Sequence, residues 1–321
     1  LKRPVFPDFI VNMKDKGMTE DAPITDLVNR TIAEVSKQGG GTVVIPEGKW
    51  KSARIVLKSN VNLHLAKGAE LEFSGCAEDY LPAVFTRHEG VEIMGPAAFI
   101  YANGENNIAI TGEGTIYGPP MDAEIRKRPN GASVVEKDVP WDMPIEQRIY
   151  DGMEGRTFYR PKTISPINCT NVLIEGITME RSTLWNVVPI YCENVIIRGI
   201  TVNSTKVPSG DGIDIESCKN VLIEYCTLNC GDDCFTLKAG RAEDGLRVGK
   251  PTENVVIRYS LAQHGHGGIT CGSETAGVIK NLYVHDCVFD GTRTGIRFKT
   301  RRNRGGGSDN TYYERLRMIN V

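Results

Sequence analysis

Short alternations of apolar and polar residues recur along the second half of the chain, and each recurrence begins with asparagine. Asparagine is followed by three apolar residues at 171–174, 194–197, 220–223, 254–257 and, more loosely, 281–284. The starts of these segments lie 23, 26, 34 and 27 residues apart. Their β-branched residues predict short strands. A repeat of this length predicts a solenoid, with one coil per repeat.

The residue types in the repeats indicate which kind of solenoid to expect. Glycine and asparagine punctuate β-branched segments, and the repeats show almost no helical period. This pattern favours an all-β parallel β-helix over a leucine-rich or helical repeat. Its coils would stack about 4.8 Å apart, the ordinary strand spacing. We expect a single domain over residues 1–321.

One clear helix precedes the repeats, over residues 21–38. Its apolar face consists of Ile24, Leu27, Val28, Ile32 and Val35. Asp21 is the expected cap, Pro23 fits the first turn, and the glycines at 39–41 end the helix. Such a helix would cover the open end of the first coil. Strands are predicted next, at 42–46, 55–57, 61–65 and 69–73.

Two segments, 75–104 and 119–163, interrupt the repeat. Insertions in a solenoid lie on one face and often shape its binding site. The second insertion carries Trp141, Tyr150 and Tyr159. These aromatics favour an ordered wall on which sugars could stack over a disordered surface loop.

The charge balance and the apolar content of the chain limit the classes of partner to expect. The chain has 38 Lys and Arg against 40 Asp and Glu, which argues against a nucleic-acid or membrane partner. No apolar run is long enough to span a membrane. No signal peptide is visible, although the chain starts at Leu1, so its removal is compatible with the sequence.

The nine cysteines show no zinc or disulfide spacing. Cys169, Cys192 and Cys218 each stand two residues before a repeat asparagine, and Cys226 and Cys287 each follow one by six. Equal positions on successive coils predict ladders of small buried thiols.

Three aspartates carry the candidate chemistry. Asp211 lies between two glycines, and Asp232 and Asp233 follow Gly231. Asp211 and Asp232 are 21 residues apart, close to one coil, so they should lie on one face of neighbouring coils. Adjacent carboxylates split their pKa values, which general acid–base catalysis requires. For a lone Gly-Asp pair, a solvated turn would be the ordinary interpretation.

Other polar residues follow at compatible spacing. His266 lies 33 residues after Asp233, about one coil plus the polar segment 241–252, so it can stack above the aspartates. Arg297 and Lys299 project to one face of a strand. Positive clusters are usually solvated, but this one suits an anionic sugar polymer better than nucleic acid.

These residues together resemble the four signature motifs of the polygalacturonases, glycoside hydrolase family 28. The motifs are Gly210-Asp211-Gly212, Gly231-Asp232-Asp233, His266-Gly267 and Arg297-Phe298-Lys299. The amino-terminal helix with its Gly-Gly-Gly-Thr-Val-Val-Ile-Pro segment, and residues 79–87, are similar to the bacterial, often exo-acting, branch.

The resemblance implies a right-handed parallel β-helix that hydrolyses α-1,4-linked galacturonan in pectin with inversion, without metal or cofactor. It implies that Asp232 is the general acid and that Asp211 and Asp233 activate water. His266 would tune the acid or the cleft, and Arg297 and Lys299 would bind a galacturonate carboxylate. A secreted or periplasmic monomer acting on plant cell-wall polysaccharide is expected.

The chain departs from the family pattern in three ways. The first motif usually has Asn-Thr before its aspartate, where this chain has Ser209-Gly210, which puts subsite preference in doubt. Phe298 replaces the usual isoleucine. The chain stops within the strand-like segment 312–321, whereas family members commonly have further coils, so it is expected to be truncated or naturally short.

Three alternatives stay open. Within the class, a rhamnogalacturonan hydrolase or another galacturonosidase would share the motifs. A β-helical pectate lyase would instead need a calcium cage and an Arg or Lys base. A non-catalytic polysaccharide-binding β-helix would need none of the carboxylate chemistry.

Overall fold

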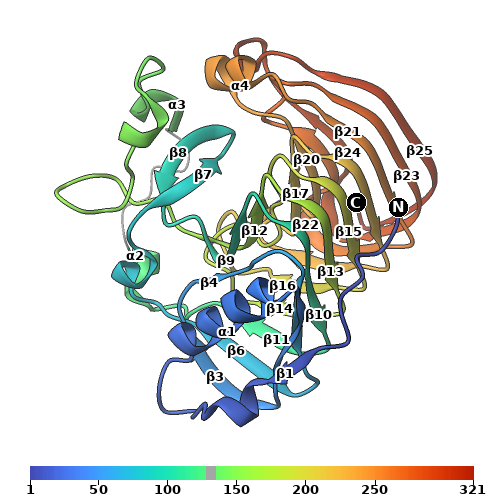
Figure 1. Cartoon of the computed structure of the whole chain (residues 1–321). Helices are drawn as coiled ribbons and strands as arrows, with labels where there is room; N and C mark the ends of the chain where they lie inside the picture. The colour runs from blue at the N-terminus through green and yellow to red at the C-terminus, as the bar shows by residue number, and fades with distance from the viewer. Residues whose placement is uncertain (128–134) are drawn as a thin grey trace.

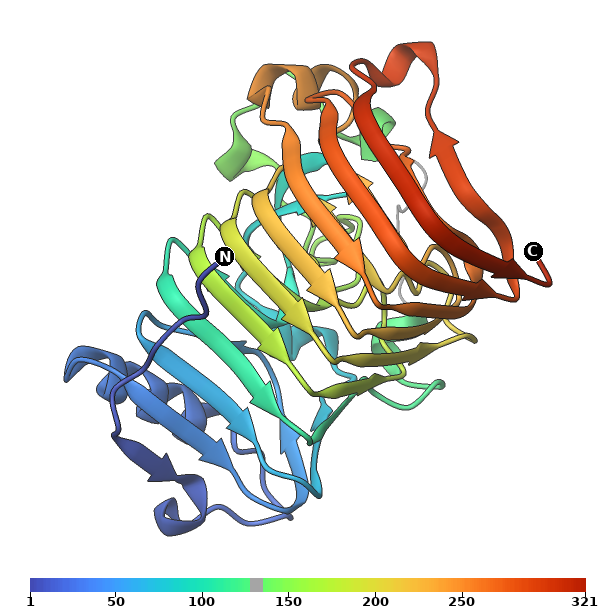
Figure 2. The same ribbon diagram turned by 90° about the vertical axis from the view of Figure 1, so that its right-hand side faces the viewer.

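The computed structural model describes residues 1–127 and 135–321. Its strands form the stacked coils of a right-handed parallel β-helix, as predicted (Figures 1 and 2). Most coils contribute one strand to each of three sheets. The helix axis runs from the amino-terminal coils to β25 (Ser308–Ile319).

The first sheet contains the asparagine-led segments. Its strands are β1 (Ile10–Asn12), β2 (Gly41–Ile45), β5 (Val61–Leu65), β10 (Asn106–Gly112), β13 (Thr170–Glu175), β15 (Glu193–Arg198), β18 (Lys219–Glu224), β21 (Thr252–Arg258) and the first parts of β23 (Ile279–Asp290) and β25. Each strand pairs in parallel with its neighbours, so equivalent positions of successive repeats lie side by side.

The second and third sheets meet at the turns that carry the candidate aspartates. The second contains β3 (Gly48–Ser52), β6 (Ala69–Phe73), β11 (Thr115–Tyr117), β14 (Thr178–Glu180), β16 (Thr201–Ser204), β19 (Thr227–Cys230) and the first part of β22 (Leu261–Gly272). The third contains β4 (Ile55–Val56), β9 (Ala98–Asn103), β12 (Lys162–Ile167), β17 (Ile213–Glu216), β20 (Phe235–Lys238), the rest of β22, and β24 (Thr292–Lys299).

The repeat asparagines have a backbone role that explains their recurrence. All five adopt the left-handed conformation, with φ between 56° and 60°. Asparagine tolerates this region better than other non-glycine residues. Their side chains also form a ladder, since Asn194 donates to Asn171 at 3.3 Å and Asn220 donates to Asn194 at 3.4 Å. Asn254 and Asn281 extend the ladder.

The core runs inside the coils, and the predicted thiol ladder lies in it. Cys169, Cys192 and Cys218 are buried, as are Cys226 and Cys287. The Cys192 amide donates to the Cys218 sulfur at 3.4 Å, so the ladder links neighbouring coils. Nine free cysteines, eight of them buried, match the packing interpretation.

The amino-terminal helix covers the first coil as predicted, but its start was predicted too early. It spans α1 (Thr25–Lys37), with Ile24 at the cap position and no capping side chain, so Asp21 is not the cap. Val28, Ile32 and Val35 are buried against the end of the core. The Thr25 hydroxyl instead accepts from the Ala53 amide at 2.7 Å, which ties the helix to the coil below.

Both insertions leave the solenoid between the second and third sheets, and both are shorter than predicted. Residues 98–103 return to the solenoid as β9, and residue 162 begins β12. The first insertion contains the short helix η2 (Ala77–Tyr80) and an antiparallel hairpin of β7 (Val84–His88) and β8 (Val91–Gly95). The second contains α2 (Glu124–Lys127), α3 (Val135–Asp138) and η3 (Ile145–Gln147).

Strand prediction elsewhere was close. The predicted strands 61–65 and 69–73 are observed as β5 and β6, and 42–46 is shifted by one residue. β3 was missed because its outward lysines mask the alternation. The remaining short elements are η1 (Met13–Lys16), α4 (Ala242–Val248) and η4 (Arg302–Arg304). None of the helices described here is long and apolar enough to cross a membrane.

The ladder generates a stability prediction. Asn194→Ala should lower the free energy of unfolding by about 1–3 kcal/mol, because alanine disfavours the left-handed backbone and removes two side-chain hydrogen bonds. Urea denaturation measures the change. Asn194→Gly is the matched control, because glycine keeps the backbone conformation and should lose less. Equal losses in the two variants would contradict the backbone argument.

Candidate active site

The three predicted aspartates meet on consecutive turns between the second and third sheets. Asp211 precedes β17, and Asp232 and Asp233 precede β20. The Gly212 amide donates to the Asp233 carbonyl at 3.0 Å, which fixes the two turns in register. One oxygen from each carboxylate lies within 4.8 Å of the other two. The one-coil spacing in the sequence therefore predicted their convergence.

Glycines beside the aspartates are required by close packing. A Cβ atom on Gly231 would lie 2.0 Å from the Val207 carbonyl oxygen. A Cβ atom on Gly267 would lie 2.1 Å from the Thr270 hydroxyl and 2.9 Å from the Asp233 carboxylate. The glycines of the motifs thus make room for the turns and for Asp233 itself.

His266 stacks one coil beyond Asp232, as the spacing predicted. Its Nδ1 lies 3.2 Å from the Asp232 carboxylate, and its backbone amide donates to the Asp232 carbonyl at 2.8 Å. The Asp232 side chain is 24% exposed, whereas that of Asp233 is 1% exposed. Asp232 is therefore the member of the adjacent pair that a bound sugar can reach.

Arg297 and Lys299 project from the same face of β24 toward Asp233. The Arg297 guanidinium lies 3.2 Å from one Asp233 oxygen, and the Lys299 amine lies 3.9 Å from the other. The two cations supply the countercharge that a buried carboxylate needs. The structure therefore brings all six predicted site residues together, and it shows that Arg297 and Lys299 also pair with Asp233.

The surroundings of Asp211 favour its protonated form. Burial, followed by the nearby charges of Asp214 and Asp232, raises the pKa of Asp211 well above its usual range. Burial likewise raises the pKa of Asp214, three residues further on. A proton is therefore retained within this group of acids, which acid–base catalysis can use.

A cavity of about 250 Å³ opens beside the aspartates, over the outer face of the third sheet. Half of its lining was not predicted from the sequence: Glu89, Trp185, Lys238, Arg241, Ser273 and Glu274. Alternation along β20 could have identified Lys238, which is in register with Gly272 on β22, as Gly272 is with Lys299. The others lie in loops, where no periodic signal exists.

The predicted aromatic wall does not line this cavity. Tyr159 is buried, and its ring stacks on His88 at 4.1 Å and packs against Tyr150 at 5.0 Å. Trp141 packs against the same apolar cluster. Tyr159 is therefore closed to a sugar, and sugar stacking stays a prediction for the half-buried Trp141 and Tyr150.

The chain matches a known protein family. The model of the glycosyl hydrolases family 28 matches residues 36–321. The chain belongs to this family. A probable polygalacturonase of Vitis vinifera is 30% identical over 292 residues, which cover 89% of this chain and 56% of the relative.

Two solved structures share the family 28 fold with this chain. The exopolygalacturonase of Thermotoga maritima superposes with a TM-score of 0.89 at 34% identity, covering 99% of this chain and 77% of that one. The family 28 exopolygalacturonase of Yersinia enterocolitica gives 0.80 at 26% identity, covering 97% and 59%. The chain spans about half the length of the curated relatives it matches.

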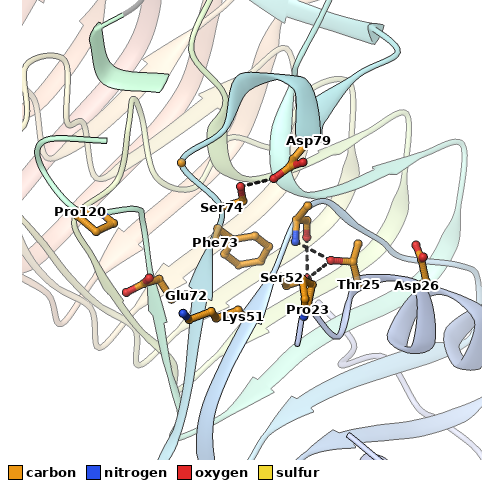
Figure 3. A pocket seen from close by; sticks show the side chains of 12 residues that line it. Pro23, Thr25, Asp26, Lys51, Ser52, Glu72, Phe73, Ser74, Asp79 and Pro120 are labelled. Atoms are coloured by element: carbon orange, nitrogen blue, oxygen red, sulfur yellow. Dashed lines mark hydrogen bonds between the residues drawn. The ribbon is translucent and has the colours of Figure 1, made fainter. Parts of the chain in front are cut away.

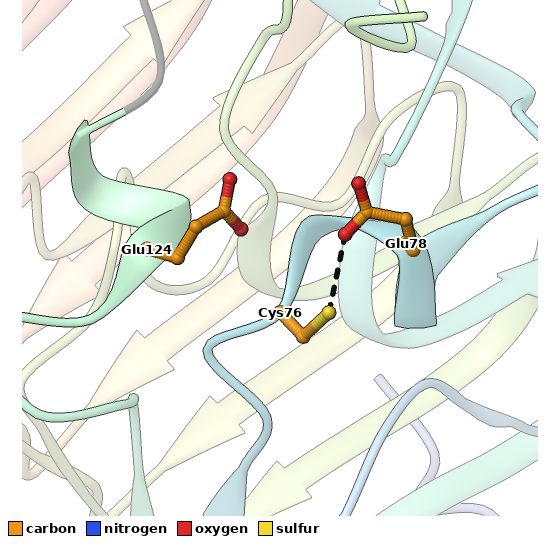
Figure 4. A group of neighbouring side chains, drawn as sticks. All are labelled: Cys76, Glu78 and Glu124. Atoms are coloured by element: carbon orange, nitrogen blue, oxygen red, sulfur yellow. Dashed lines mark hydrogen bonds between the residues drawn. The ribbon is translucent and has the colours of Figure 1, made fainter.

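Among the residues that the structure describes, two groups of side chains have the spacing of metal ligands. The three aspartates form one, and exposed Cys76, Glu78 and Glu124 form the other (Figure 4). The Cys76 thiol donates to Glu78 at 3.1 Å, and this hydrogen bond raises the pKa of Cys76. A thiol kept protonated is a poor metal ligand, since the thiolate is the ligating form.

A larger cavity of about 460 Å³ lies at the amino-terminal coils, between α1, β3 and β6 (Figure 3). Two of its three acids are engaged, because Asp79 accepts a hydrogen bond from Ser74 and Glu72 pairs with Arg181 at 3.0 Å, and the third, Asp26, is exposed. No pair of buried carboxylates lines it. The smaller cavity beside Asp211 is therefore the stronger candidate for the active site.

The raised pKa of Asp211 generates a stability prediction. Asp211→Asn should be more stable than wild type at pH 7, and this advantage should shrink toward pH 3. Below the unfolded pKa of about 3.9 the Asp211 carboxyl costs wild type no stability. As the pH rises toward the higher folded pKa, wild type loses stability, because the carboxyl ionises more readily in the unfolded chain than in its buried site. The amide never ionises.

Urea denaturation between about pH 3 and pH 8 measures this difference. Asp15→Asn, at an exposed aspartate, is the control and should show no such trend. An Asp211→Asn variant less stable than wild type at every pH would contradict the electrostatic argument.

Proposed function

We propose that this chain hydrolyses α-1,4-linked galacturonan from a chain end, as an exo-acting polygalacturonase. The observation that carries the proposal is the meeting of three carboxylates, one histidine and two cations beside a cavity of about 250 Å³. The names of the relatives and their shared fold support this substrate and mode of action.

The carboxylates divide the chemistry by exposure. Asp232 is the general acid in this proposal, because its side chain reaches the cavity and faces His266. It gives its proton to the glycosidic oxygen as the bond from that oxygen to the anomeric carbon breaks. Asp211 and Asp233 orient the water that attacks the same carbon, and one of them takes up its proton.

The hairpin of β7 and β8 supports action at chain ends. The Arg241 amide donates to the carbonyl of Gly90, at the hairpin tip, at 3.0 Å. Gly90 has a φ of 86°, and a Cβ atom there would lie 2.7 Å from the Arg241 amide nitrogen. Glu89 lines the cavity beside it. We infer that this hairpin tip limits the cavity of about 250 Å³ to a terminal sugar and keeps a long chain from passing through.

Substrate class and location follow as parts of the proposal. Pectin is an anionic plant cell-wall polymer, so we propose a secreted or periplasmic monomer. Arg297 and Lys299 remain candidates for binding a galacturonate carboxylate beyond the cleaved bond, in addition to pairing with Asp233. Ser209 lines the cavity and is a further candidate contact.

The stereochemical course is inversion in this proposal. Retaining glycosidases have carboxyl groups about 5–5.5 Å apart and inverting ones about 6.5–9.5 Å. The nearest oxygens here lie within 4.8 Å, on the retaining side of the rule. A third carboxylate, however, gives water two anchors, as inversion needs. Proton NMR during early turnover should show the β-anomer first, and an α-anomer first would contradict inversion.

One assay tests the activity and the acid together. Wild type with polygalacturonate in excess chelator should release reducing sugar as short products, with little early loss of viscosity. Asp232→Asn should lower kcat by about 10²–10⁴-fold, because one proton-transfer group is lost from a nearly isosteric side chain. An unchanged melting temperature is the control for folding.

Each alternative gives a different result in the same assay. A pectate lyase would lose activity in chelator and would otherwise form unsaturated products. A binding protein would release nothing. Rapid viscosity loss would indicate internal cleavage, and full activity in Asp232→Asn would exclude this residue as the acid.

A further inference from the structure

The turn that carries Asp211 is held by buried side chains that the catalytic proposal leaves without a role. The Asp211 carbonyl oxygen accepts two hydrogen bonds from Asn186, one from its backbone amide at 2.9 Å and one from its side-chain amide at 2.9 Å. Asn186 is 1% exposed and does not line the cavity. It therefore cannot touch a sugar bound there, and it can act on one only through a neighbour.

The two hydrogen bonds from Asn186 have different origins. The backbone bond belongs to the ladder between coils, and any residue other than proline at this position could make it. The side-chain bond is specific to asparagine. The same side-chain amide donates to the Ser182 hydroxyl at 3.2 Å, and its oxygen accepts from the Thr163 hydroxyl of β12 at 3.4 Å. Asn186 thus links the Asp211 turn to the preceding coil.

A second buried side chain holds the other end of the turn. The Ser204 hydroxyl donates to the carbonyl of Gly210, the residue before Asp211, at 2.6 Å, and Ser204 is 2% exposed. A Cβ atom on Gly210 would lie 2.9 Å from the Ser204 carbonyl oxygen, and one on Gly231 would lie 2.7 Å from it. Ser204 therefore lies against both of the turns that carry the aspartates.

These contacts fix the backbone from which the Asp211 carboxylate projects. The carbonyls on both sides of its Cα atom are held by buried side chains, and Asp211 itself is 3% exposed. One of its oxygens lies within 4.8 Å of an oxygen of Asp232 and one of Asp233. A displacement of about 1 Å in a reacting group can cost about 10²-fold in rate. The geometry of the three carboxylates thus depends on the buried contacts beneath them.

We propose that Asn186 and Ser204 are positioning residues, which hold Asp211 where it orients the attacking water. The proposal rests on the proposed function and deepens it, because it names the groups that place one of the water-binding carboxylates. Neither side chain lines the cavity. Both residues should therefore affect the rate of bond cleavage and leave the binding of the sugar unchanged.

Steady-state kinetics on galacturonate oligomers test the role of Asn186. Asn186→Ala should lower kcat about 10–100-fold and keep KM within about twofold of wild type, because Asp211 is misplaced while the cavity is intact. Asn186→Asp keeps the volume but replaces the donor with an acceptor, so its kcat should fall at least as far. Ser204→Ala should lower kcat several-fold with the same unchanged KM, and it serves if the Asn186 variants do not fold.

A double-mutant cycle shows whether Asn186 acts through Asp211. In an Asp211→Asn background, Asn186→Ala should cause little further loss of kcat, because the carboxylate that it positions is already absent. A purely structural role would instead give the same fold-loss in both backgrounds. That additive result would overturn the proposal.

Asn194→Ala is the matched control, because it removes the same kind of side chain from the asparagine ladder of the first sheet. It should lower the melting temperature and keep the kcat of wild type at temperatures where it stays folded. Wild-type kcat in Asn186→Ala would overturn the proposal. So would an equal loss of kcat in Asn194→Ala.

The two proposals fail in different ways. Hydrolysis of galacturonan by wild type, with unchanged kcat in the Asn186 and Ser204 variants, would leave the function standing and remove the positioning role. A wild type that releases no sugar from galacturonan would overturn the function, and the positioning role with it.

Discussion

Backbone hydrogen bonding between coils fixes the register on which everything else in this molecule depends. Each strand of the first sheet pairs in parallel with the strand one repeat away, and the asparagine ladder repeats that spacing at the side-chain level. Two residues one repeat apart therefore become neighbours. Slippage of a single coil would separate Asp211 from Asp232 and His266 from both.

A second constraint shapes the cavity, and it comes from buried charge. Arg148, from the second insertion, pairs with Asp244 of α4 at 2.9 Å, and both side chains are 1% exposed. The Asp244 carboxylate also accepts from the Glu92 amide of the hairpin at 2.9 Å. Removing one partner of such a pair costs about 3–5 kcal/mol. These contacts join the second insertion, the hairpin of β7 and β8, and α4 into one unit (Figure 1).

Periodicity explains how much could be predicted. The repeat alone predicted that five site residues lie on one face of successive coils, because their spacings are close to one coil: Asp211, Asp232, His266, Arg297 and Lys299. Glu274 stands in a loop whose path follows from packing, and Glu89 reaches the cavity through an insertion with no counterpart in other coils. No local pattern encodes those approaches. The aromatics of the second insertion were predicted to stack on sugars, because a sequence cannot show which side of an insertion is buried.

The buried cysteines have a consequence for how the solenoid opens. Burial raises the pKa of Cys226 to about 12 and that of Cys287 to about 11. The thiolate is the reactive form, so these cysteines should not react with alkylating reagents while their coils are closed. Because the thiols stand on different coils, the rate at which each thiol is alkylated reports the opening of its own repeat. Their order of labelling would distinguish a solenoid that unzips from one end from a solenoid that melts at once.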